Sequence, residues 1–428
     1  MKISKFVKTK EFMIKFSIAI VLFAILILSF FFSKQIERSL GLSVELFPSE
    51  VSSEEIKDAK YVVEYIDVGQ GDSTFVVLPD GKTLLIDGGK TEYGKKVCDV
   101  ISSFDVDKID YLIATHADAD HIGGLNVVLE KFEVKNIYRP FQIAGTGTNS
   151  QNFVVYEDED LADYYEYMIK KYNNKTKISR VSSDIYNNFI TKIYSEYYTS
   201  NEGYEKSPVF VFYDGLKISG ENYELEFFAP SIRSEDYDLS EFSNTLGFAT
   251  NGYGVSDSNG NSAILLLSIF NDTFLFTGDA PCSSGSSSAT KKYEELDFIS
   301  SLTDEELLKF KNISVYLAGH HGSKYSTSEK LLSLTTPRFN VISVGIDNSY
   351  GHPADETLER IKSIKSCEDY LLETRKFGSI TFGRVSDGLV YTLELQTDSE
   401  NLIVSWYLLG TCIYVFAVYV IFSVRVKK

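Results

Sequence analysis

The chain has 428 residues, of which 44% are hydrophobic, so it can bury a sizeable core and wholesale disorder is excluded. Its formal net charge is −18, and its basic ends hold seven net positive charges, which leaves −25 for the rest of the chain. Such an acidic surface repels phosphate backbones, which makes extended nucleic-acid binding unlikely but leaves room for a small phosphoester held by metal ions.

The first apolar run, Phe16–Phe32, predicts a membrane helix over residues 16–33. The basic N-terminus, residues 1–15, holds five lysines, which keep this end of the chain in the cytoplasm. A cleaved signal peptide is the competing interpretation. It is disfavoured because the run is longer than an ordinary signal core and no A-x-A-like site follows it.

Short apolar segments in the first third predict strands at Tyr61–Val68, Lys82–Ile86 and Asp110–Ala114. The third strand ends at Thr115-His116, and Ile122–Leu129 are predicted to form the first part of a helix. The segment Thr115–His121 is therefore expected to be a loop between a strand and a helix, which can aim several side chains at one point.

All five histidines of the chain lie in three short segments, Thr115–His121, Gly319–Ser323 and Tyr350–Pro353. Scattered histidines would have been the ordinary outcome, so this distribution predicts one metal site. The first segment combines imidazole nitrogens and carboxylate oxygens, which suit Zn²⁺ or Mn²⁺; its donors are His116, Asp118, Asp120 and His121.

The middle of the chain holds an insert at about 156–206, in which ten of 51 residues are tyrosine. One interpretation is an elaborated surface subdomain. The other is a substrate wall, because tyrosine faces attract quaternary ammonium groups such as choline. Polar stretches at Asn251–Asn261 and Ser283–Thr290 are predicted loops.

A hairpin is predicted from Ser262–Ser268 and Thr273–Thr277, and it delivers Asp279 at a strand end. Val315–Ala318 is a further predicted strand, which ends just before His320-His321. The four cysteines form no CxxC pair, so the sequence predicts neither a disulfide framework nor a zinc knuckle; a single bridge among Cys98, Cys282 and Cys367 stays open.

The last apolar run, Leu402–Val424, has 23 residues without a charge and predicts a second membrane helix over 402–424. Aromatic rings at its start favour the membrane interface, and the basic tail 425–428 closes it. A buried core helix is the alternative. The basic residues at both ends place both termini in the cytoplasm and the domain between them outside, at the plasma membrane.

Together these segments resemble the metallo-β-lactamase superfamily, and within it the extracellular hydrolase domain of the competence protein ComEC. The motifs occur in the family's order: DVGQGD (67–72), IDGG (86–89), THxDxDHxGG (115–124), TGD (277–279), HHGSKxST (320–327) and YGHP (350–353). The resemblance implies an α/β fold, the αβ/βα four-layer sandwich, for a hydrolase domain over 60–397 between the two membrane helices. The ComEC-type membrane channel is absent.

Carried over residue by residue, the resemblance makes His116 and Asp118 ligands of one metal ion. Asp120, His121 and His321 would hold a second ion, and Asp279 would bridge both. His320 would be a nearby polar or phosphate-contacting group, although the choice between His320 and His321 as ligand stays open. His352 would lie at the rim, and the substrate-binding set is Gln70, Asp72, Asn261 and Ser323.

Three departures from the family pattern affect these expectations. Position 118 is Asp rather than the His of typical β-lactamases, and no histidine occurs between 122 and 319, where Asn261-Ser262 replaces the usual metal ligand. The first metal site is therefore expected to be weak, water-filled or selective for Mn²⁺. Glu373-Thr374-Arg375 stands where ComEC-like domains carry Arg-Thr-Asp.

The sequence thus predicts a membrane-anchored, extracytoplasmic, metal-dependent hydrolase that cleaves a phosphodiester with one or two Zn²⁺ ions or with Mn²⁺. A metal-activated hydroxide would be the nucleophile, and Asp120 would orient it. His320 or His352 would stabilise negative charge on the substrate oxygen. The alternatives are a phosphocholine or cell-wall polymer esterase and a non-catalytic membrane assembly or binding module. The oligomeric state is not predicted.

Overall fold

The structure is a computed structural model that describes residues 49–52, 55–56, 58–140, 183–199, 209–212, 214–229, 258–283, 294–346, 348–364, 370–385 and 388–394. Both predicted membrane segments lie outside the described residues. Among the described helices, none is long and apolar enough to cross a bilayer.

The first sheet has nine strands among the described residues, in the order β1-β16-β15-β2-β3-β4-β5-β6-β7. Its antiparallel part runs from β16 through β4, and its parallel part from β4 through β7. The strands are β1 (Ser49–Glu50), β2 (Val62–Tyr65), β3 (Thr74–Val77), β4 (Thr83–Ile86), β5 (Lys108–Ile113), β6 (Glu133–Arg139), β7 (Val209–Val211), β15 (Ile380–Val385) and β16 (Gly388–Leu393).

The second sheet has seven described strands, in the order β14-β13-β12-β11-β10-β9-β8. The predicted hairpin is confirmed, since β10 and β11 pair antiparallel from Leu265 opposite Phe276 to Ile269 opposite Asp272. The strands are β8 (Lys217–Gly220), β9 (Tyr223–Ala229), β10 (Ile264–Ile269), β11 (Asp272–Phe276), β12 (Val315–Leu317), β13 (Phe339–Ile342) and β14 (Leu371–Glu373).

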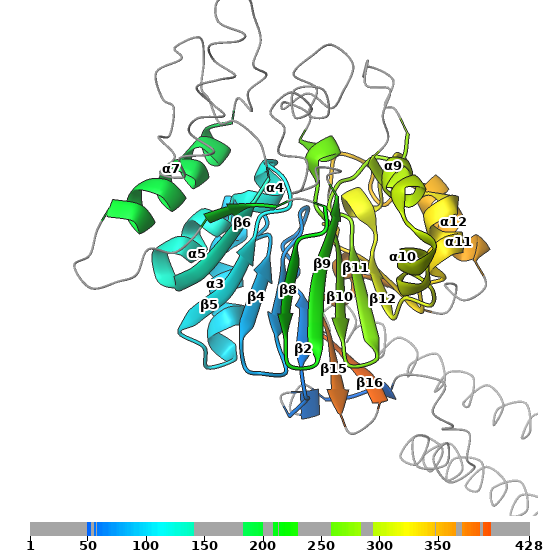
Figure 1. Cartoon of the computed structure of the whole chain (residues 1–428), viewed down its shortest axis with the longest axis horizontal. Coiled ribbons are helices and arrows are strands. Elements are labelled where there is room, and N and C mark those ends of the chain that lie inside the picture. The colour runs from blue at the N-terminus through cyan, green and yellow to red at the C-terminus, as the bar shows by residue number, and fades with distance from the viewer. Residues whose placement is uncertain are drawn as a thin grey trace, which may run out of the picture. The chain divides into compact units, whose positions relative to one another are not determined.

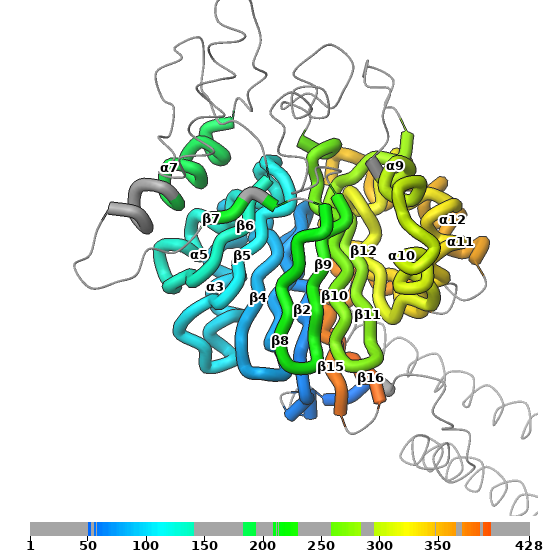
Figure 2. Tube along the Cα trace, viewed as in Figure 1, coloured from blue at the N-terminus to red at the C-terminus, as the bar shows by residue number. Residues whose placement is uncertain are grey.

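Helices cover the outer face of each sheet (Figures 1 and 2). On the first sheet lie α3 (Gly94–Ser103), α5 (Leu125–Lys131) and α7 (Asp184–Thr199). On the second lie α9 (Glu294–Ser301), α11 (Glu329–Thr335) and α12 (Asp355–Ser363), with α10 (Asp304–Lys309) beside them. Short helical turns occur at η1 (Thr91–Tyr93), α4 (Ala119–Ile122), η3 (Asn259–Asn261), η4 (Gly319–Gly322) and α13 (Thr374–Phe377).

Strand alternation explains this layering, because successive side chains of a strand point to opposite faces of the sheet. In β4, Leu84 and Ile86 pack in the core between the two sheets, whereas Leu85 packs in the core beneath the helices. A third core lies between the second sheet and its own helices. Three cores separate four layers, so the predicted αβ/βα sandwich is confirmed for the described domain.

Two local expectations differ from the structure. β3, Thr74–Val77, was not predicted, and it lies between β2 and β4 in the first sheet. The helix α7 falls inside the Tyr-rich insert, and its Tyr186, Phe189 and Ile193 are buried in the core of the first sheet. This part of the insert therefore belongs to the core, while the predicted helical spacing around Leu161–Tyr172 lies outside the described residues.

Candidate metal centre

The histidine-bearing loops meet in one place, since the ring of His121 lies 4.1 Å from that of His116 and 5.2 Å from that of His321. The turn α4, which carries His121, lies at one end of the sandwich (Figure 1). Asp87 follows β4 and His116 follows β5, and these two strands are parallel neighbours. Asp279 follows β11 and His320-His321 follow β12, which are parallel neighbours in the other sheet. Because the carboxyl ends of parallel strands meet at the same edge of a sheet, four segments distant in sequence deliver side chains to one place.

Two groups of potential metal ligands share one carboxylate. The first consists of Asp72, His121, Asp279 and His321, and the second of His116, Asp118 and Asp279; within each group the ligand atoms all lie within 4.8 Å of one another. All of these side chains are buried except that of Asp118, which is partly exposed.

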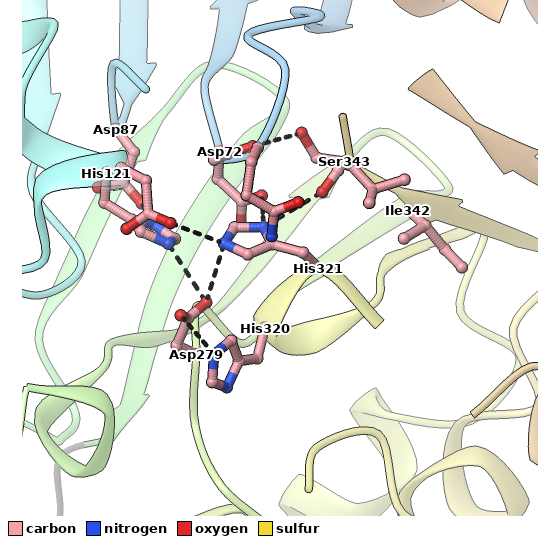
Figure 3. Close-up of polar contacts among 12 residues, drawn as sticks. Asp72, Asp87, His121, Asp279, His320, His321, Ile342 and Ser343 are labelled. Carbon is pink, nitrogen blue, oxygen red and sulfur yellow. Dashed lines mark hydrogen bonds and ion pairs between the residues drawn. The ribbon is translucent and has the colours of Figure 1, made fainter. Parts of the chain in front are cut away.

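Asp279 turns a different oxygen to each group, as Figure 3 shows for its contacts with His121, His321 and His320. Its Oδ1 lies 3.2 Å from His121 Nε2 and 3.9 Å from His321 Nε2. Its Oδ2 lies 3.7 Å from His116 Nε2. A carboxylate with its two oxygens facing separate imidazoles is suited to bridge two cations.

Several of these atoms are buried without a hydrogen-bond partner. They are Nε2 of His116, His121 and His321 together with Oδ1 of Asp279. The contact of 3.2 Å between His121 Nε2 and Asp279 Oδ1 is at ion-pair distance but lacks the geometry of a hydrogen bond. Buried polar atoms in folded proteins are rarely left unpaired, and each such group calls for an explanation. Imidazole nitrogen and carboxylate oxygen are the donors that Zn²⁺ and Mn²⁺ bind, so the residues present fit a metal centre.

Asp87 accepts hydrogen bonds behind this centre. Its Oδ2 lies 2.8 Å from His121 Nδ1, and the carboxylate also accepts from the backbone N–H of Thr115 at 2.8 Å and from its hydroxyl at 2.6 Å. A hydrogen bond at Nδ1 fixes the ring and leaves Nε2 for the metal. Sequence reasoning did not assign Asp87 a role, although the Ile-Asp-Gly-Gly motif contained it.

Asp72 likewise lies behind His321, one of the two histidines that follow β12 in the second sheet. Its Oδ1 lies 3.1 Å from His321 Nδ1, which also lies 3.2 Å from the backbone carbonyl of Ser343. The sequence placed Asp72 in the substrate-binding set, whereas the structure places it behind His321. Its role in the donor group is therefore to orient this imidazole.

The charges in the centre shift the pKa values of the Asp279 carboxyl and the His321 imidazole in opposite directions. Burial opposes ionisation of Asp279, but the surrounding histidines hold its pKa well below the usual range. Burial likewise opposes protonation of His321, yet Asp279 and Asp72 raise its pKa to about 10. Without a cation, the negative charge of the carboxylates is balanced by protons on the imidazoles, so metal binding is expected to release protons.

The tandem histidines point to different sides of Asp279 because of their backbone. His320 and His321 both have left-handed conformations, with φ of 51° and 54°, and their ring planes are 82° apart. His321 is buried within the donor group, whereas the side chain of His320 is 27% exposed, with Nε2 3.5 Å from Asp279 Oδ2. The arrangement favours His321 as ligand and leaves His320 facing the open side.

The remaining predicted site residues surround this centre. Asp120 Oδ2 lies 3.5 Å from His321 Nε2, outside both compact donor groups. Gln70 Nε2 lies 3.4 Å from His352 Nδ1, and the His352 ring lies 5.4 Å from that of His320. Asn261 is buried at the end of η3, and Ser323 accepts a hydrogen bond from the N–H of Tyr325.

The departures from the family pattern have structural counterparts. Where the usual metal histidine is replaced, Ser262 Oγ accepts a hydrogen bond from the backbone N–H of Asp279 at 3.1 Å. Ser262 therefore holds the backbone of Asp279, the residue that both donor groups share. Glu373 is buried and pairs with Arg375 and Lys376, while Thr374 Oγ1 accepts from the N–H of Val344.

Comparisons with known proteins agree with this geometry. A model described as "Metallo-beta-lactamase superfamily" matches residues 66–176. ComE operon protein 3 of Bacillus subtilis is 24% identical over 319 residues, which cover 70% of this chain and 30% of that protein. The chain thus spans less than a third of the length of this relative.

Two solved structures show more distant likeness. The metallo-β-lactamase-fold protein YhfI of Bacillus subtilis is 10% identical, covering 73% of this chain and 96% of its own, with a TM-score of 0.35. CmlA, a diiron β-hydroxylase from Streptomyces venezuelae, is 11% identical, covering 81% of this chain and 55% of its own, with a TM-score of 0.38.

Proposed function

We propose that this chain, which belongs to the metallo-β-lactamase superfamily and is similar to ComE operon protein 3, is a membrane-anchored hydrolase of small phosphodiesters. The observation that best supports a metal-dependent hydrolase is that two groups of potential metal ligands share Asp279. Their histidine Nε2 atoms are buried without a hydrogen-bond partner, which is how ligands lie when a cation is their intended partner.

Metal ions held by His116, Asp118, Asp279, His121 and His321 would lower the pKa of water and stabilise negative charge on a substrate oxygen. Zn²⁺ suits the imidazole donors, and the carboxylates make Mn²⁺ the second candidate. Asp87 orients His121, Asp72 orients His321, and Ser262 holds the backbone of Asp279. The Nδ1 of His116 lies 3.0 Å from the hydroxyl of Thr115, so the protein holds these ligands in place before a cation binds.

Asp120 is the candidate for orienting the attacking water. Burial disfavours its charged form, but the adjacent His321 and His121 hold its pKa below the usual range, so it is a carboxylate at neutral pH. A carboxylate in that position accepts a hydrogen bond from a water molecule and directs its lone pair toward the substrate. The side chain is 23% exposed, so it is within reach of solvent.

His320 and His352 line the open side of the centre. His352 is half-buried, and burial together with the neighbouring His320 and His321 lowers its pKa to about 4. A neutral imidazole still donates one N–H, which can stabilise charge on a phosphoryl or leaving-group oxygen. These two side chains therefore fit substrate contact better than ligation.

The negative charge of the chain favours a small phosphodiester over a nucleic-acid polymer as the substrate. With −25 between its basic ends, the chain offers few cations to follow a nucleic-acid backbone. The extracytoplasmic location rests on the two apolar runs and their basic flanks, Lys2–Lys15 and Arg425–Lys428. Tags at either terminus should then resist external protease in intact cells, and cleavage of a terminal tag would contradict this topology.

Metal analysis of the purified protein joined to a substrate screen tests the activity. We expect bound metal and hydrolysis of bis-p-nitrophenyl phosphate, with little cleavage of single-stranded DNA or nitrocefin. Preferential cleavage of p-nitrophenyl phosphocholine would favour the esterase alternative. A metal-loaded protein that cleaves none of these substrates would favour the non-catalytic assembly or binding module.

A further inference from the structure

A cavity of about 350 Å³ opens beside the metal centre. His352 belongs to both, since its ring lies 5.4 Å from that of His320 and also lines the cavity. Other lining residues are Ser323, Lys324, Tyr325, Tyr350 and Asp355. A volume of this size is in the range of small-molecule sites, and it adjoins the position where a substrate would react.

Tyr350 presents an aromatic face in this cavity. Its side chain is among the most exposed large apolar groups of the described residues, at 67%. The ring nevertheless has a defined position, because it stacks on His352 with a centroid distance of 5.8 Å and an interplanar angle of 26°. An exposed ring held parallel to a rim histidine offers its outer face for stacking.

The segment that carries both rings is braced by Asn348. Its Nδ2 donates to the carbonyls of His352 at 2.7 Å and Gly345 at 3.0 Å, and its Oδ1 accepts from the N–H of His352 at 2.9 Å. The segment that carries Tyr350 and His352 is therefore ordered before a ligand binds, which reduces the entropy lost on binding.

Lys324 brings a positive charge to the cavity, which Asp355 and Glu356 also line. Its ammonium lies 5.2 Å from the centre of the Tyr325 ring, and no acidic partner within 4.0 Å is found for it among the described residues. The cation occupies the face of Tyr325 and would repel a quaternary ammonium group. It would attract the phosphate of an anionic ligand.

We propose that this cavity is a nucleoside subsite, in which the base of a small nucleotide phosphodiester stacks on Tyr350 while its phosphate is cleaved at the metal centre. This inference rests on the proposed phosphodiesterase function and names its substrate class. Asp355 and Glu356 also line the cavity, and their negative charge restricts the subsite to a short ligand, because a longer phosphate chain would meet repulsion there.

The test compares two esters that release the same p-nitrophenol: thymidine 5′-(p-nitrophenyl phosphate), which carries a base, and methyl p-nitrophenyl phosphate, which does not. The full-length wild-type protein should prefer the thymidine ester in kcat/KM. Tyr350→Leu should reduce that preference roughly tenfold, in the range found for loss of one base-stacking ring. Tyr350→Phe should keep it, because the aromatic face remains.

Phe270→Ala is the matched control, since this ring is 39% exposed in the β10–β11 turn at the other end of β11 from Asp279. It should retain wild-type activity on both esters. An unchanged preference in Tyr350→Leu would overturn the subsite. So would a roughly tenfold rise in KM for p-nitrophenyl phosphocholine in that variant with the base preference intact, because the ring would then serve a cationic head group.

Direct binding separates failure of the subsite from failure of the proposed activity. A metal-loaded protein that hydrolyses neither ester contradicts the proposed function. Equilibrium dialysis with thymidine 5′-monophosphate then decides the subsite alone. Binding weakened about tenfold by Tyr350→Leu and not by Tyr350→Phe supports it, whereas equal binding by wild type and Tyr350→Leu overturns it.

Discussion

His121 and Asp87 are joined by a buried contact of 2.8 Å between Nδ1 and Oδ2, on the side of the imidazole that faces away from the candidate metal ligands. The same carboxylate accepts two hydrogen bonds from Thr115, at the start of the loop that carries His116. One acidic side chain thus holds His121 directly and the start of the His116 loop through Thr115, although it belongs to neither candidate donor group.

Asp87→Asn should therefore lower metal affinity roughly 10- to 100-fold, the usual effect of losing a carboxylate behind a ligand histidine. Chelator competition measures the affinity directly. Asp99→Asn is the control, because Asp99 is exposed on α3 and its ion-pair partners within the described part of the chain are the surface lysines Lys95 and Lys131. Equal affinity in the Asp87 variant and the wild type would show that the Thr115 loop is held by other contacts.

Asp279→Ala should remove both metal ions and nearly all hydrolysis, since Asp279 is the carboxylate common to both groups. His116→Ala should remove only the ion of its own group. Metal analysis of the two purified variants gives the stoichiometry, with retained circular dichroism as the check on folding. Two equivalents of metal in Asp279→Ala would rule out a shared ligand.

Asp120→Ala should separate water orientation from ligation. If Asp120 chiefly orients the attacking water, kcat should fall by about 10²- to 10⁴-fold, as for loss of a general base, while metal content changes little. If it is a ligand of the second ion, as the sequence predicts, metal content should fall with kcat. Measuring kcat and metal content on one preparation of the variant distinguishes the two roles. A kcat equal to that of the wild type would exclude both roles.

Gly71→Ala should damage the centre through the backbone. Gly71 has φ of 147°, and a Cβ there would lie 2.3 Å from the carbonyl oxygen of Asp120. The conformation and the clash together should cost about 1–3 kcal/mol and displace the Asp120 loop. Gly388→Ala is the matched control, since a Cβ there meets nothing within 4 Å. Urea unfolding of both variants gives the comparison, and equal stability would be the contrary result.

Glu64 should make stability depend on pH. Burial, with the nearby Glu394 charge, raises its pKa to about 7 from 4.5, and Lys96 opposes the rise only in part. The folded state therefore keeps a proton that the unfolded state loses, so this group's contribution declines as pH rises from about 4.5 to about 7. Glu64→Gln should raise Tm more at pH 8 than at pH 5.

Exposed Glu133 provides the comparison for that experiment, because its side chain is exposed on β6. Glu133→Gln should change Tm by the same small amount at both pH values. A Glu64→Gln variant with an equal shift at pH 5 and pH 8 would show that Glu64 does not take up a proton on folding.

The fold class was implied by the resemblance of the motifs to a known family, whereas the residues themselves predicted the β10–β11 hairpin and the grouping of the histidines into three segments. Each depends on local patterns: a turn between two apolar runs, or chemically distinctive residues at short spacing. His116, Asp118 and His121 lie within six residues, so their meeting at one loop required no knowledge of the rest of the chain.

The roles of Asp87, Asp72 and Ser262 were decided only by the tertiary structure. Asp72 meets His321 across 249 positions, and Asp87 reaches His121 because β4 and β5 are parallel neighbours. The left-handed backbone at His320 and His321, which sends one ring into the donor group and the other toward the open side, is also invisible in the sequence. Pairings of this kind arise when two sheets pack together, and no local propensity encodes which distant carboxylate will stand behind which imidazole.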